Sequence, residues 1–134
     1  MAGDLKQSEL EKITINVGYV DLGHIDLLVR EGFYSNRTDL IRTAIRNQIA
    51  SHADTLRQTV SRRSLVLGIH HYSRKDLEGA RARGERLQIQ VLGLASIADD
   101  VTPALALKTI ESIVVLGTLH ASASVKRALA SRIK

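Results

Sequence analysis

The chain contains no cysteine and few aromatic residues: one phenylalanine, three tyrosines and no tryptophan among 134 residues. The absence of cysteine excludes disulfides, thiolate metal sites and a cysteine nucleophile. The apolar fraction of 44% is ordinary for a folded protein, but only 3% of the residues are aromatic. Any hydrophobic core must therefore be built from Ile, Leu, Val and Ala.

Long hydrophobic runs are also missing. The apolar stretches, such as SIVVLG at residues 112–117, are far shorter than the roughly 20 residues of a membrane helix. The first twelve residues, MAGDLKQSELEK, are polar and lack the apolar centre of a signal peptide. We therefore expect a cytoplasmic protein.

The motifs that usually mark an active site are absent from the sequence as well. There is no Gly-rich phosphate loop, no GxSxG turn and no spaced set of carboxylates and histidines. We expect neither an enzyme nor a protein that holds a cofactor.

The charge that is present is mostly positive, with a net charge of +5 and a pI near 9.9. Residues 37–63 carry six Arg against two Asp, so the positive surface begins in the middle of the chain. A basic protein suits a polyanionic partner, and nucleic acid is the first candidate.

Residues 12–17 alternate between polar and β-branched apolar side chains. Ile13, Ile15 and Val17 fall on one face of the predicted strand, and Lys12, Thr14 and Asn16 fall on the other. A lone strand of this kind can neither pair its edges nor fill a core. The pattern therefore makes physical sense as an intertwined dimer, in which two copies of the strand form a ribbon.

Two amphipathic helices are predicted after this strand. Asp21 is a candidate cap for the first, Gly32 is expected to end it in a left-handed conformation, and Phe33 to fold back onto its apolar stripe. The stripe consists of Leu22, Ile25, Leu28 and Val29. The second helix is expected to start at Ser35 or Asn36 and to continue towards residues 62–63, because no Gly or Pro interrupts it.

This arrangement resembles the ribbon-helix-helix family, the CopG/MetJ/Arc-type DNA-binding proteins. The resemblance rests on KITINVG at residues 12–18 and on EGFYSNRTDLIRTAIRNQI at residues 31–49. It is especially similar to the nickel-responsive repressors of that family, in which the second helix begins with G-Y-x-N-R-S/T-x-x-I-R. The resemblance covers about 40 of the 134 residues.

The resemblance implies two sets of DNA contacts. The three strand residues that read bases in the major groove fall on Lys12, Thr14 and Asn16, whose side chains suit guanine, thymine and adenine edges. The phosphate contacts, made by amides at the start of the second helix, fall on Ser35, Asn36, Arg37 and Thr38. The competing interpretation is that these residues are simply the solvated faces of a strand and a helix. Arg42 and Arg46 are open to both interpretations.

The C-terminal half contains an internal repeat. Residues 88–106 and 112–130 match at an offset of 24, with eight of 19 positions identical, and a weaker copy begins at Leu65. Each copy predicts a strand of five to seven residues followed by a short helix, and units of this kind usually stack. Exposed ends rich in Val, Ile and Leu tend to pair with another copy.

We therefore expect an α+β protein in three parts. These are a flexible arm at residues 1–10, a ribbon-helix-helix domain for DNA binding and dimerisation at residues 11–63, and an α/β repeat domain for oligomerisation at residues 64–134. A compact α+β sensor fold is the alternative for the last part.

Histidines at positions 70 and 71 raise the question of a metal sensor. Adjacent residues of a strand point to opposite faces, and the nickel-responsive repressors use His-x-His together with a cysteine. The sequence therefore departs from that pattern, and we expect no metal site. Asp99 and Asp100 precede Thr102-Pro103, which is typical of a turn and helix cap.

The function expected from the sequence is a dimeric, sequence-specific transcriptional regulator, most simply a repressor that binds double-stranded DNA. The C-terminal part would link copies into a higher homo-oligomer. The alternatives are a DNA-organising or plasmid-partition protein, and a regulator that responds to an effector or a metal. No membrane association is expected.

Overall fold

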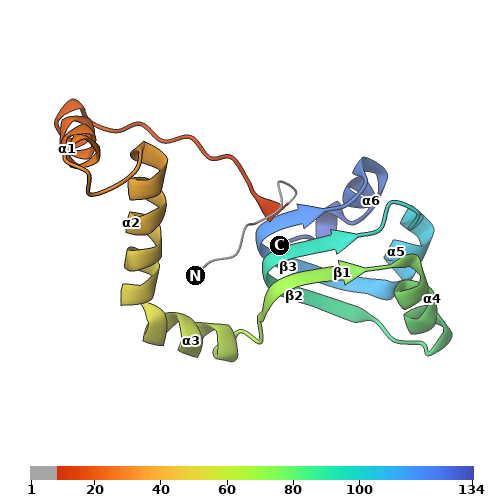
Figure 1. Cartoon of the computed structure of the whole chain (residues 1–134). Helices are drawn as coiled ribbons and strands as arrows, with labels where there is room; N and C mark the ends of the chain where they lie inside the picture. Colours follow the sequence, from red (N-terminus) through yellow and green to blue (C-terminus); the bar gives the residue numbers. More distant parts are fainter. Residues whose placement is uncertain (1–8) are drawn as a thin grey trace. The chain divides into compact units, whose positions relative to one another are not determined.

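The computed structural model describes residues 9–134, and it divides the chain into two compact units. One unit spans Leu10–Gln58 and the other contains Thr59–Lys134. The predicted N-terminal arm, residues 1–10, lies outside the described residues except for its last two. The content is mixed helix and strand, which is consistent with the expected α+β class (Figure 1).

The unit at residues 10–58 is made of an extended segment and helices. Residues 10–18 are extended and belong to no helix or strand of the single chain, and they are followed by α1 (Tyr19–Arg30) and α2 (Arg37–Ser51). A third helix, α3 (Ala53–Arg62), contains the division between the two units. The predicted strand at residues 12–17 thus has the extended conformation of a strand, but it pairs with no other strand among residues 9–134.

The ends of α1 differ from the prediction in two respects. The helix begins after Gly18, whose extended backbone precedes it, and Asp21 lies in the first turn, so the expected cap at Asp21 was wrong. A carboxylate in that turn still favours the positive end of the helix. At the other end Gly32 has φ +86° as expected. Phe33 is 71% exposed, so it does not fold back onto the stripe within one chain.

The end of α1 is closed by backbone hydrogen bonds of the Schellman type. The amide of Phe33 donates to the carbonyl of Leu28 at 3.0 Å, and the amide of Gly32 donates to that of Val29 at 3.1 Å. Only a left-handed residue at position 32 lets both bonds form, because the chain must reverse over the last turn. This explains the direction in which the chain leaves α1 towards α2.

The start and end of α2 follow from local hydrogen bonds. Of the two predicted caps, Asn36 is the one used: its Oδ1 accepts from the amide of Asp39 at 2.8 Å. The carboxylate of Asp39 in turn accepts from the amide of Ser35 at 3.0 Å. The predicted continuation to residues 62–63 is interrupted at His52, where α2 ends and α3 begins.

The second unit is a parallel three-stranded sheet with a helix after each strand. Its elements are β1 (Val66–Tyr72), α4 (Arg74–Ala82), β2 (Leu87–Ile97), α5 (Pro103–Thr109), β3 (Ile110–His120), α6 (Ala123–Ala128) and the short 3-10 helix η2 (Ala130–Arg132). The strand order is β1-β2-β3. Two of the strands have eleven residues, so they are longer than the repeat pattern predicted.

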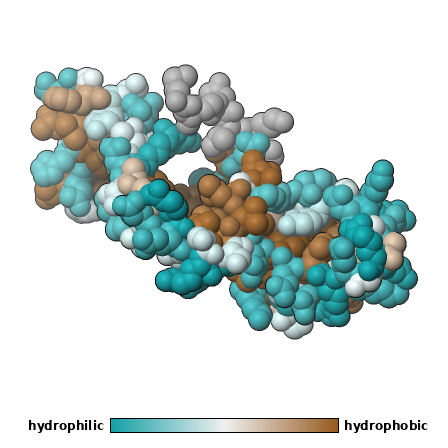
Figure 2. Space-filling view, turned by 90° about the horizontal axis from the view of Figure 1, so that it is seen from below, coloured by the Kyte–Doolittle hydropathy of each residue, from teal (hydrophilic) through white to brown (hydrophobic). Residues whose placement is uncertain are grey.

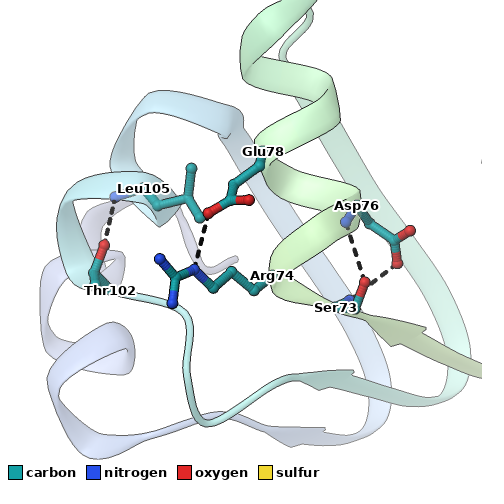
Figure 3. Close-up of polar contacts among 6 residues, drawn as sticks. All are labelled: Ser73, Arg74, Asp76, Glu78, Thr102 and Leu105. Atoms are coloured by element: carbon teal, nitrogen blue, oxygen red, sulfur yellow. Dashed lines mark hydrogen bonds and ion pairs between the residues drawn. The ribbon is translucent and has the colours of Figure 1, made fainter.

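Three helices of this unit, α4, α5 and α6, each start at a hydroxyl side chain that accepts a hydrogen bond from a free amide. Figure 3 shows the caps of α4 and α5. Ser73 and Asp76 form a reciprocal capping box at α4, with bonds of 3.1 and 3.0 Å. Thr102 caps α5, with Pro103 in the first turn, and Ser122 caps α6. Each cap follows a strand or the turn after it. The capping residues therefore fix where each strand ends and the next helix begins.

The hydrophobic core of this unit lies between the sheet and its three helices. It is built from aliphatic residues of alternate strand positions and of the helix faces: Leu77, Ile89, Val91, Ala95, Ile97, Val101, Leu105, Ala106, Ile110, Ile113, Val125 and Leu129. No aromatic residue belongs to the fully buried set among the described residues. The core is therefore aliphatic, as the composition required.

A row of three glycines crosses the sheet at its centre. Gly68 pairs with Gly93, and Gly93 pairs with Gly117, so the register joins the same position of each sequence repeat. All three have positive φ, of +121°, +138° and +122°. A Cβ at Gly93 would lie 2.2 Å from the carbonyl oxygen of Gly68, so only glycine fits at this position.

The face of the sheet opposite α4, α5 and α6 carries apolar residues that these three helices do not cover. Leu67 and Ile69 of β1 are 72% and 56% exposed, and Leu116 of β3 is 47% exposed. They belong to a set that shares the strand positions outside the core: Leu67, Ile69, Leu92, Leu94, Val114 and Leu116. We call this set the open face. Hydrophobic surface of both units is visible in Figure 2.

None of the described helices has both the length and the hydrophobicity that a bilayer-spanning segment requires.

Candidate nucleic-acid interface

The segment predicted to read DNA is exposed in the single chain. Lys12, Thr14 and Asn16 are all exposed, and they alternate with Ile13 and Ile15 along an extended backbone. Alternation in an extended chain places the three polar side chains on one side and the isoleucines on the other. The two isoleucines are 75% and 65% exposed. An extended segment with one polar and one bare apolar side has the properties of a strand that lacks its partner.

The unit that carries this segment has no buried residue in any of its helices, since none is found in α1, α2 or α3. Its large exposed apolar residues include Val20, Leu27 and Leu28 of α1 and Ile45 and Ile49 of α2. Apolar residues at helical spacing normally face a core. Within one chain the helices of this unit bury no residue, so these apolar side chains remain available to pack against a second chain.

The start of α2 provides the second predicted contact surface. The amides of Ser35 and Asp39 are engaged by the Asn36–Asp39 cap, whereas the amides of Arg37 and Thr38 belong to the first turn, where a helix offers no acceptor of its own. Such amides, at the positive end of the helix dipole, suit an anion. Within residues 9–134, no hydrogen bond or ion pair links this helix start to Lys12, Thr14 or Asn16.

The side chain of Arg37 is used within the unit. Its Nε and Nη2 donate to the two carboxylate oxygens of Asp26 at 2.7 and 2.8 Å, which joins the start of α2 to α1. The pair is solvent-accessible, with side-chain exposures of 57% and 46%. The predicted phosphate contact of Arg37 can therefore come from its backbone, while its guanidinium positions the helix. Sequence reasoning missed this pair, because it joins two different helices and depends on how the turn between them folds.

The hydrogen bond from Arg37 lowers the pKa of Asp26 below its ordinary value of 3.8, and the same bond raises the pKa of Arg37. A carboxyl group whose pKa is lower in the folded state stabilises that state above its ordinary pKa. This contribution is lost as the pH falls through the lowered value. We expect the carboxyl carbon of Asp26, followed by NMR, to titrate below 3.8 in the intact chain.

The matched variant for this prediction is Arg37→Met, in which the pKa of Asp26 should return towards the ordinary value. An Asp26 titration that is the same with and without the Arg37 guanidinium would show that the pair does not form in solution.

The remaining predicted arginines, Arg42 and Arg46, are exposed on α2. No ion pair involves either of them among the described residues. They are available to a polyanion, as the basic segment at residues 37–63 suggested.

His70 and His71 are adjacent residues of β1. No group of three or more His, Asp or Glu within residues 9–134 is placed to hold a metal ion. The register sets His70 beside Ala95 and His71 beside Ser96, so the two adjacent histidines face opposite sides of the sheet. Asp99 and Asp100 form the turn before α5, and the cap itself is Thr102.

Comparison with known protein families identifies the class of the molecule as a DNA-binding transcriptional regulator. The profile of the ribbon-helix-helix transcriptional regulator family matches residues 8–126, which is most of the chain, and the protein belongs to this family. Regulators of this family bind DNA, generally act as dimers and are generally non-enzymatic. No match was found among curated proteins or among solved structures.

Proposed function

We propose that two copies of the chain pair residues 12–17 antiparallel, and that the resulting ribbon enters the DNA major groove. The observation that supports this most directly is the extended and exposed state of residues 12–17, which pair with no strand among the described residues, in a unit whose helices have no buried residue. Pairing gives the backbone of each segment its missing hydrogen bonds. It also brings Ile13 and Ile15 onto the apolar stripes of α1 and α2 from both copies.

In this arrangement the polar sides of the two strands form one surface with six side chains: Lys12, Thr14 and Asn16 from each copy. Lys can donate to guanine O6 and N7, and Asn can pair bidentately with adenine. The amides at residues 35–38 would hold a phosphate on each side and so fix the ribbon in register. Bases are then read by the strand, and the helix starts set the orientation.

Asn16→Ala is expected to lower the affinity for the operator by about 1–3 kcal/mol per lost bidentate contact, and to leave binding to random DNA nearly unchanged. The measurement is fluorescence anisotropy on both DNAs at fixed salt, with the operator first selected from a random library. Arg42→Ala is the matched control, because a phosphate contact should weaken both DNAs alike. If Asn16→Ala lowers the affinity for operator and for random DNA equally, Asn16 does not contact bases.

Residues 64–134 are proposed to link copies of the chain through the open face. Sheets made only of parallel strands normally have both faces covered, because both are apolar. Here α4, α5 and α6 cover one face, and Leu67, Ile69 and Leu116 stay exposed on the other. A second sheet of the same kind is the simplest cover, since the ribbon already brings two copies together and raises their effective concentration.

Leu67→Glu combined with Leu116→Glu is expected to reduce the assembly to a dimer, which light scattering after size exclusion would measure. Charges placed on an apolar contact must be desolvated when it forms, so the contact should be lost. Leu107→Glu serves as the control, because Leu107 is 37% exposed on α5, on the helix side of the sheet. An unchanged assembly in the double variant would exclude the open face as the contact.

A dimer or larger assembly with these surfaces would act as a repressor by occupying a palindromic or repeated operator. Its affinity should fall steeply with salt, because several phosphates are neutralised by each copy. Genome-wide footprinting tests the regulatory role: a few strong sites are expected. Broad, even coverage would instead indicate a DNA-organising protein.

A further inference from the structure

We infer that the cavity at the carboxyl ends of the three strands binds a small molecule that carries an oxyanion, a carboxylate or a phosphate group. The cavity has a volume of about 520 Å³. The side chains of His71, Ser96, His120 and Lys126 line it, together with Asp99 and the backbone that leaves β2 and β3. In parallel sheets with helical connections, ligands bind outside the carboxyl ends of the strands.

The register explains how these side chains come together. His71, Ser96 and His120 are paired neighbours on β1, β2 and β3, so they form a row across the sheet. Adjacent strands lie roughly 4.8 Å apart, which places the two histidines on either side of the serine about 10 Å from one another at their backbones. A group seated over Ser96 is then within reach of both imidazole rings.

The chemistry of the row favours an anion. Nδ1 of His71 lies 2.6 Å from Oγ of Ser96. When the serine hydroxyl donates in that bond, Nε2 of the ring carries the proton and can donate to a ligand. His120 can donate in the same way, and the ammonium of Lys126 adds a positive charge from α6. Hydrogen bonds from such donors to a charged oxygen are the strong kind.

Among the described residues that line the cavity, Asp99 is the one acidic side chain. It opposes a bare anion and would accept a hydrogen bond from a hydroxyl or amino group next to the oxyanion. A metal ion is disfavoured, because no three metal-binding side chains of the described part converge at one point. The structure thus points to a small metabolite with an acidic group rather than to a cation.

The row lies on the same side of the sheet as the open face, because Leu67, Ile69 and His71 alternate along β1. A ligand in the cavity would therefore border the surface through which copies are proposed to assemble. This link to assembly rests on the proposed function, whereas binding itself does not. An occupied cavity would then shift the assembly, and with it the affinity for DNA.

Inorganic phosphate added to the full chain at constant ionic strength is the test, with the imidazole signals of the histidines followed by NMR. The signals of His71 and His120 are expected to shift along a saturable curve in the millimolar range. Lys126→Met should weaken binding roughly five- to tenfold, since a charge-assisted contact is lost. Asp99→Asn should strengthen it roughly two- to fivefold, because a repelling carboxylate is removed.

His70→Gln is the matched control, because His70 neighbours His71 but faces the other side of the sheet. Phosphate binding should survive this change and should be lost with His71→Gln combined with His120→Gln. Equal shifts with chloride, equal losses with His70→Gln, or tight binding of Zn²⁺ at His71 and His120 would overturn the inference. Operator binding of each variant is also measured without phosphate. Loss of phosphate binding at the cavity can therefore be distinguished from loss of DNA binding.

Discussion

Gly93→Ala is expected to destabilise residues 64–134 by about 2–6 kcal/mol, which is enough to unfold a domain of ordinary stability or nearly so. Gly93 has φ +138°, a conformation in which a side chain is strained. Its new Cβ would also meet the carbonyl oxygen of Gly68 at 2.2 Å. That atom is backbone in the neighbouring strand, so the clash can be relieved only by separating β1 from β2. Urea unfolding followed by circular dichroism measures the loss.

Gly68→Ala is the matched comparison, because it separates the cost of backbone strain at positive φ from the cost of a steric clash with the neighbouring strand. Gly68 also has positive φ, at +121°, but the nearest atom to its added Cβ is a side-chain nitrogen of His70 at 4.0 Å. We therefore expect strain alone, about 1–3 kcal/mol. Gly117→Ala should resemble Gly93→Ala, since its Cβ would lie 2.0 Å from the carbonyl oxygen of Gly93. Equal losses at positions 68 and 93 would contradict the close approach of the strands.

Ile13→Asp combined with Ile15→Asp is expected to abolish the dimer and to reduce operator binding at least about 100-fold. Burying one isoleucine contributes about 1.5–3 kcal/mol, and the proposed ribbon buries four in the dimer. Without the partner chain, α1 and α2 have no core, so their helix content should fall as well. Light scattering, circular dichroism and anisotropy on operator DNA give the three measurements.

Two controls make this result specific to the ribbon. Lys12→Ala combined with Thr14→Ala changes the polar side of the same segment and should leave the dimer intact. Because the open face could also hold copies together, all samples are compared in the Leu67→Glu and Leu116→Glu background. A dimer that persists in that background after both isoleucines are replaced would rule out residues 12–17 as the pairing segment.

The two expected losses concern different physical problems. At Gly93, the backbone of β2 lies so close to the backbone of β1 in the same chain that no side chain fits between them. At Ile13 and Ile15 the neighbour is missing from the single chain, and the apolar side chains remain in solvent. The unit at residues 59–134 has a hydrophobic core within one chain, whereas the unit at residues 10–58 is proposed to form its core only with a second copy.

Local features could be predicted from the sequence to a considerable extent. The cap at Asn36, the left-handed Gly32 and the extended segment at residues 12–17 follow from residue types and short periods, because they depend on atoms a few residues apart. The cap predicted at Asp21 was wrong, since Gly18 already allowed the helix to begin earlier. The repeat offset of 24 residues located the matching strand positions, but not the full length of β2 and β3.

By itself, the sequence determined the aliphatic core, the polar and apolar sides of residues 12–17 and the family to which the chain belongs. Each of these depends only on residue type and spacing. Only the tertiary structure decided that Arg37 pairs with Asp26, that three glycines meet across the sheet and that His71, Ser96 and His120 form one row. These contacts join residues 11 to 25 positions apart. Their formation depends on how whole elements pack, and no local preference of the chain encodes that.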